Sequence, residues 1–82
     1  MLDIENISMN YIKKENLYGS ADGLRYMMCK KDDLLIVCVW PEPLGFAATS
    51  ENLKEYKEFP FDNSGREAAI NYINEKISML SN

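Results

Sequence analysis

The side chains best suited to chemistry in this chain are two cysteines, Cys29 and Cys38, because the sequence contains no histidine. Histidine is the commonest general base and metal ligand, and it is the usual partner of a nucleophilic cysteine. Its absence excludes a Cys–His site and leaves zinc only two thiols and carboxylates. Redox activity is one interpretation of the pair, but free cysteine is among the most buried residue types. We therefore expect two reduced thiols that behave as small apolar residues of buried strands.

Acidic side chains gather at two places in the sequence. Asp32 and Asp33 are adjacent, and such a pair could hold a metal, but aspartate also favours turns, so a solvated turn explains it. Residues 62–67 (DNSGRE) have part of a calcium-loop pattern without its twelve-residue spacing, and a helix cap explains them equally well. An anion at that helix start would meet only Gly65 and Arg66. We therefore predict no catalytic residue, no metal site and no cofactor, and a protein that is not an enzyme.

Trp40 precedes the stiff stretch Pro41-Glu42-Pro43. A tryptophan at the end of a strand beside a rigid loop can anchor a partner peptide or a ligand. Tryptophan is also highly buried on average, so Trp40 could instead close the end of a sheet within the core. Both interpretations stay open at this point.

Residues 24–40 (LRYMMCKKDDLLIVCVW) predict the β-hairpin on which the rest of the fold is built, because two apolar runs of strand length enclose a charged tetrad. The simplest register is centred between Lys31 and Asp32, so that Lys30 faces Asp33 with opposite charge. In that register Cys29 faces Leu34, Arg25 faces Cys38, and the two cysteines lie roughly 13 Å apart along the strands. No intrachain disulfide is expected.

The hairpin has two faces, because side chains alternate along a strand. One face collects Leu24, Tyr26, Met28, Leu35, Val37 and Val39. The other collects Arg25, Met27, Cys29, Leu34, Ile36, Cys38 and Trp40. A sheet with one solvated face would alternate apolar and polar residues, so both of these faces need cover.

One helix is expected before this sheet sequence and one after it, at the two ends of the chain. Residues 3 to about 15 predict a helix with Asp3 as N-cap, and its apolar stripe includes Ile4 and Ile7. Ser64 and Glu67 form a capping box for a C-terminal helix. The apolar stripe of that helix consists of Ala69, Ile70, Ile73, Ile77 and Leu80.

The segments between these elements are less regular. Residues 16–23 predict a turn or loop, and strand pairing should fail at Pro41. Residues 44–49 are either a further strand or an irregular return, and Thr49 or Ser50 could cap a single helical turn. Residues 54–61 predict an edge strand, because lysines and Pro60 suit an edge that must not aggregate.

The predicted fold is therefore α+β in a single domain that spans residues 1–82. It has an N-terminal helix, an antiparallel sheet of three or four strands built on the 24–40 hairpin, and a C-terminal helix. The order resembles the α-β-β-β-α outline of double-stranded RNA-binding domains, which implies nucleic-acid binding as an alternative function. That family has a basic cluster at the start of its last helix, where residues 64–69 here have one arginine and one glutamate. With a net charge of −4, nucleic acid is not the expected partner.

The leading functional hypothesis is a small non-catalytic interaction or accessory domain, most simply a homodimer, with another protein as a further option. If both helices cover one hairpin face, the other stays open, and an exposed apolar face usually marks an interaction site. One helix on each face would instead make a monomer, and the sequence does not decide which face opens. The acidic N-terminus and the lack of a long apolar run predict a cytoplasmic protein without a membrane span. The candidate interaction surface is Met27, Leu34, Ile36, Cys38, Trp40 and Glu42.

Overall fold

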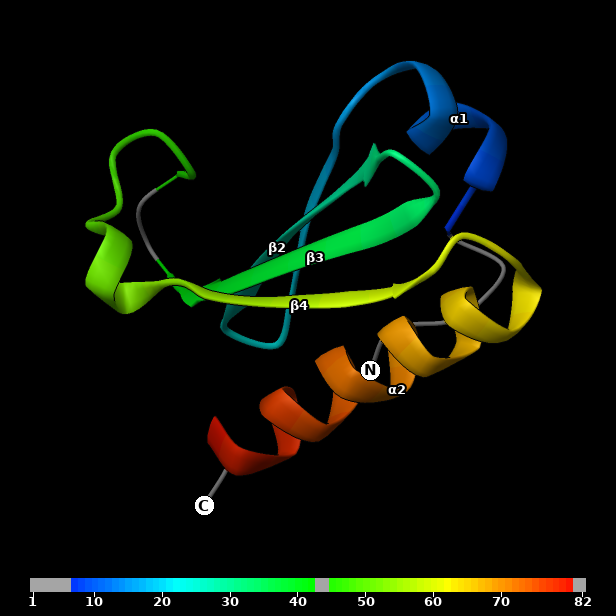
Figure 1. The fold of residues 1–82 in the computed structure, drawn as a ribbon. Helices are drawn as coiled ribbons and strands as arrows, with labels where there is room; N and C mark the ends of the chain where they lie inside the picture. Colours follow the sequence, from blue (N-terminus) through cyan, green and yellow to red (C-terminus); the bar gives the residue numbers. More distant parts are fainter. Residues whose placement is uncertain (1–6, 43–44, 81–82) are drawn as a thin grey trace.

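A computed structural model shows an α+β fold with a helix, a four-stranded antiparallel sheet and a C-terminal helix (Figure 1). It describes residues 7–42 and 45–80. The elements are α1 (Met9–Lys14), β1 (Leu17–Ala21), β2 (Leu24–Lys31), β3 (Leu34–Pro41), the 3₁₀ turn η2 (Glu51–Leu53), β4 (Glu55–Pro60) and α2 (Asn63–Leu80). The predicted fold class is therefore confirmed.

The strands follow one another across the sheet in the order β1-β2-β3-β4, with each pair antiparallel. The predicted 24–40 hairpin is β2 and β3, but its predicted register is wrong. Lys31 pairs with Leu34 and Arg25 with Trp40, so the two-residue turn is Asp32-Asp33, and Asp32 adopts a φ of 56°. Aspartate tolerates this left-handed backbone better than most residues, which favours a turn here over one at Lys31-Asp32. Each residue's partner shifts by two positions, so the side chains stay on their predicted faces.

Strand β1 corrects a second prediction, because residues 17–21 form a strand where the sequence suggested a loop. Ala21 pairs with Leu24 across the turn Asp22-Gly23, whose φ values are 51° and 89°. Two successive positive φ values define a type I′ hairpin turn, for which Asp-Gly is a preferred sequence. This dipeptide was the signal in the sequence that could have identified β1.

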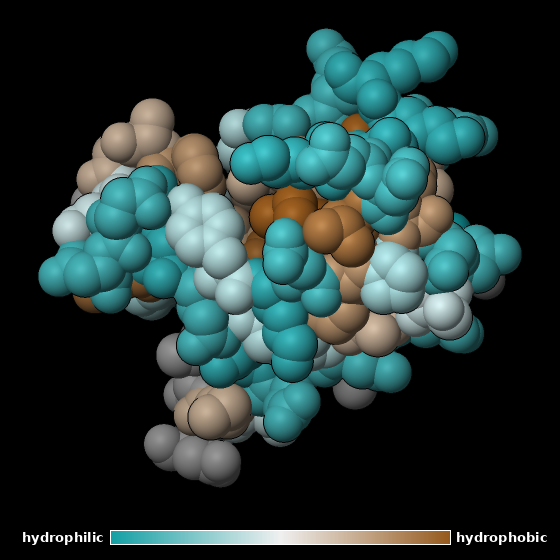
Figure 2. Space-filling model, viewed as in Figure 1, coloured by the Kyte–Doolittle hydropathy of each residue, from teal (hydrophilic) through white to brown (hydrophobic). Residues whose placement is uncertain are grey.

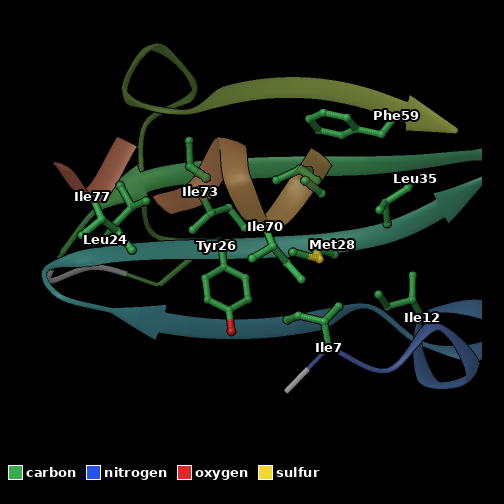
Figure 3. Packing of buried hydrophobic residues seen from close by; sticks show 13 residues of the cluster. Ile7, Ile12, Leu24, Tyr26, Met28, Leu35, Phe59, Ile70, Ile73 and Ile77 are labelled. Carbon is green, nitrogen blue, oxygen red and sulfur yellow. The ribbon is translucent and has the colours of Figure 1, made fainter. Parts of the chain in front are cut away.

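Helix α2 packs on the first face of the sheet, the one that carries Leu24, Tyr26, Met28, Leu35, Val37 and Val39 (Figures 1 and 3). The predicted helical stripe is buried there at Ala69, Ile70, Ile73 and Ile77, and β4 adds Phe59. Ile7 and Ile12 from the N-terminal segment join the same cluster. Both helical segments therefore contribute to the core on one side of the sheet.

The predicted N-terminal helix is shorter than expected. Helix α1 begins at Met9, where the Ser8 hydroxyl accepts a hydrogen bond from the Tyr11 N–H at 3.3 Å. Ile7 is buried just before the helix rather than on its stripe. The predicted cap Asp3 and stripe residue Ile4 lie outside the described residues.

Helix α2 is capped by Asp62, two residues before the predicted cap Ser64. The Asp62 carboxylate accepts hydrogen bonds from the Gly65 N–H and the Ser64 hydroxyl, both at 2.8 Å. These bonds hold the pKa of Asp62 below its usual value. Ser64 therefore lies in the first turn of α2 and supports the cap without being the cap itself. Gly65 is buried against the Pro60 carbonyl, which brings the helix close to the end of β4.

The chain between β3 and β4 is an irregular return. Residues 46–48 form a turn, and Ser50 precedes the single 3₁₀ turn η2. Of the two alternatives for residues 44–49, the described part from residue 45 onwards supports the return. Strand β4 pairs with β3 and lies last in the strand order, so its predicted edge position is confirmed.

Candidate interaction surface

The second face of the sheet, which points away from α2, is covered at one end by residues 45–54, which we call the flap. Its Phe46 ring packs edge-on against Trp40, with ring centroids 5.4 Å apart, and against Tyr18 at 6.1 Å. Beneath it, Met27, Cys38 and Trp40 form a small separate core. The flap therefore covers the apolar side chains on this half of the second face, as α2 covers those on the first face.

A lysine with a buried side chain holds the flap in place. The Lys54 side chain is only 3% exposed, and its ammonium lies 3.7 Å from the centroid of the Phe46 ring. The same ammonium contacts the Glu51 carboxylate at 3.0 Å, and the Tyr56 hydroxyl donates to Glu51 at 3.0 Å. Both partners lower the pKa of Glu51. Burial, followed by the bond to Glu51, raises the pKa of Tyr56 to about 12, so Tyr56 stays protonated at neutral pH.

The other half of the second face has no such cover from the described residues. We call it the open floor, and the strand register places Cys29, Lys31, Leu34, Ile36, Glu58 and Pro60 on it. Leu34 is 37% exposed, and Ile36 and Cys29 are partly exposed. A hollow of about 630 Å³ lies here, lined by Lys31, Ile36, Tyr56, Lys57 and Glu58. Figure 2 shows brown, apolar atoms reaching the surface near the middle of the view, bordered by teal polar side chains.

The six residues of the candidate interaction surface fall into two groups. Met27, Cys38 and Trp40 are 5%, 0% and 2% exposed beneath the flap, so a partner could reach them only if the flap moved. Leu34 and Ile36 are accessible on the open floor, and Glu42 is exposed beyond β3, where its N–H donates to the Gly23 carbonyl. The use of this surface for binding stays a prediction.

The structure adds Phe46 and Lys54, which sequence reasoning did not select. Neither position has a local signal, because the role of each depends on the turn that brings residues 45–54 back over Trp40. Phe46 in the short apolar run 44–49 was the nearest hint, since an aromatic residue in a loop needs an apolar neighbour.

The two cysteines are free thiols, as expected, although the expected reason was wrong. In the observed register Cys29 faces Ile36 and Cys38 faces Met27, so the cysteines are diagonal neighbours on the same face. Diagonal neighbours lie about 7–8 Å apart, just beyond the roughly 7 Å that a disulfide spans. Burial raises the pKa of both thiols, partly offset at Cys29 by Lys31 and at Cys38 by the Tyr56 hydroxyl and Lys54. Neither thiol is activated as a nucleophile.

A second, smaller hollow of about 350 Å³ lies beside the flap, lined by Tyr18, Arg25, Trp40 and Phe46 among others. Within residues 7–42 and 45–80, no three histidine, cysteine or acidic side chains are close enough to share a metal ion. In the same part of the chain, no helix has the length and apolar character needed to cross a membrane. Compared with known proteins, the chain matches no family model, no curated protein and no solved structure.

Proposed function

We propose that this protein is a small non-catalytic interaction domain that self-associates through the open floor. The observation that carries the proposal is an apolar strip in the middle of a sheet, formed by Cys29, Leu34 and Ile36, without cover from the described residues. Such strips on a folded chain usually mark interaction sites, and a two-fold contact with a second copy is the commonest way to bury one.

The placement of the helices supports this proposal. Ile12 of α1 and Ile73 of α2 belong to the same buried cluster as Val37 on the first face. The arrangement with one helix on each face, which would favour a monomer, is therefore not the one adopted. The flap covers only part of the face that the helices leave.

The size of the open floor sets the expected affinity. It spans about two residues on each of three strands, which is less than the roughly 800 Å² per partner of a standard interface. We therefore expect a dimer that dissociates in the micromolar range and exchanges readily. The cytoplasmic location and the absence of catalysis belong to the same proposal.

The observed order has one strand more than the α-β-β-β-α outline on which the nucleic-acid alternative is based. Arg66, the one basic residue at the start of α2, donates to the Ile7 carbonyl at 3.2 Å and so already has a structural role. A titration with duplex RNA at low salt should show no saturable binding at micromolar protein concentration.

Ile36→Asp tests the proposal. Ile36 is partly exposed at the middle of the open floor, so a carboxylate there should prevent docking while the chain stays folded. Light scattering over a micromolar concentration series should show the mass of the parent rising from 9.4 kDa towards twice that value, while the variant stays at 9.4 kDa. Asp32→Asn is the matched control, because asparagine suits the positive φ at this exposed turn and the mass should not change. A parent that stays at 9.4 kDa throughout the series would contradict the proposal.

A further inference from the structure

The flap limits how two open floors can meet. Two sheets that pack face to face lie about 10 Å apart, and the flap already occupies that space over Trp40 and Cys38. A two-fold axis parallel to the strands would place both flaps at the same end of the interface, where they would collide. A two-fold axis across the strands reverses the second copy, so that each flap comes to lie over the hairpin-turn end of the other sheet.

The surface of the flap suits that position. Ala47 and Ala48 are exposed, and Leu53 is 55% exposed although it is a large apolar residue. The open floor opposite has the complementary character, with Leu34 and Ile36 beside the hollow of about 630 Å³. A flap seated there would cover apolar surface on both copies at once.

The charges of the two surfaces do not oppose contact between two copies. The flap carries two formal charges, the Glu51 carboxylate and the Lys54 ammonium, which contact each other at 3.0 Å, so it has no net charge. On the open floor, Lys31 and Glu58 also sum to zero, because the Lys57 ammonium lies over the Phe59 and Tyr72 rings on the first face. Among the residues that the structure describes, neither Lys31 nor Glu58 has an ion pair, so both remain able to meet a charge from outside.

We propose that the flap of each copy occupies the open floor of the other, with a two-fold axis across the strands and Leu53 of one copy against Ile36 of the second. This inference rests on the proposed function and specifies its partner surface. Because the interface is two-fold, the Leu53–Ile36 contact occurs twice. The flap is then both the cover of its own Trp40 and the element that the second copy binds.

A charge exchange at this contact tests the arrangement. Leu53→Lys and Ile36→Glu should each weaken the dimer by about tenfold or more, because each places a charge in an apolar contact without a partner. Mixed in equal amounts, the two variants should form a heterodimer, since the introduced ammonium and carboxylate then meet across one contact and the other contact stays apolar. Light scattering measures the masses, and a tagged copy of one variant shows whether it captures the other. Met79→Lys is the matched control, because Met79 is 62% exposed on α2 and away from both surfaces.

The outcomes separate the inference from the proposed function. If Leu53→Lys stays dimeric while Ile36→Asp dissociates, the open floor is used but the flap does not bind it, and the inference falls alone. If the parent is a monomer throughout the concentration series, both the proposed self-association and the inference about the flap are wrong. Circular dichroism confirms that each variant is folded, and Leu53→Lys decides the matter by itself if Ile36→Glu does not fold, because the exposed Leu53 has no core role.

Discussion

Gly65 shows how a single residue sets the distance between helix and sheet. A methyl group at this position would overlap the Pro60 carbonyl oxygen, which belongs to the backbone and cannot rotate away. Elsewhere in a helix, replacement of glycine by alanine stabilises by roughly 0.5–1 kcal/mol. At Gly65 the overlap with the Pro60 carbonyl should make the same replacement destabilising.

We therefore predict that Gly65→Ala lowers the free energy of unfolding by about 1–3 kcal/mol, the usual range for inserting a methyl group into a packed contact. Chemical denaturation measures the change. Gly45→Ala is the control, since a methyl group at Gly45 meets no atom within 4 Å and its change should stay within about 0.5 kcal/mol. Equal effects at both positions would mean that the contact with Pro60 does not hold α2 in place.

At the scale of elements, the flap is held by the Glu51 carboxylate, which becomes protonated at low pH. Its Glu51 carboxylate joins Lys54 and Tyr56, and these bonds make the pKa of Glu51 lower in the folded than in the unfolded chain. A carboxyl group of this kind stabilises the fold fully above its unfolded pKa of about 4.3, and the contribution is lost as the pH falls through the folded value.

We predict that acid loosens the flap before the sheet unfolds. The chain has one tryptophan, Trp40, which lies against Phe46, so its fluorescence should change as the pH falls below about 4 while far-ultraviolet circular dichroism persists. Glu51→Gln should remove this early step, because a neutral amide does not titrate. A single transition, identical for both signals and unaffected by Glu51→Gln, would show that the flap and the sheet unfold together.

The elements also show where sequence reasoning succeeds. The two faces of the hairpin followed from period-two alternation, which a register error of two residues leaves intact. Helix α2 followed from its isoleucine spacing. Strand β1 was missed because its five residues, LYGSA, are mixed in character, although Asp22-Gly23 marked the turn. The flap could not be predicted, since its contacts join Phe46 to Trp40 and Tyr18 through tertiary packing with no local pattern.

At the scale of the whole molecule, both helices and β4 complete one core while the second face is covered only in part. Met27, Cys38 and Trp40 belong to the predicted interaction surface, and the chain's own flap covers them. Leu34 and Ile36 remain accessible on the open floor. The accessible part of the candidate surface is therefore smaller than the sequence suggested, so the proposed dimer should be weak and reversible.

The two thiols report on this arrangement without any substitution. Cys29 is partly exposed on the open floor, whereas Cys38 is fully buried beneath the flap. We predict that a thiol reagent modifies Cys29 faster than Cys38, and that the Cys29 rate falls as protein concentration rises because the dimer covers the open floor. The Cys38 rate should instead follow flap opening and rise at acidic pH relative to that of Cys29. Denatured, non-reduced protein should return two free thiols per chain. A Cys29 rate that does not depend on concentration across the micromolar range would show that the open floor stays exposed and that no second copy binds it.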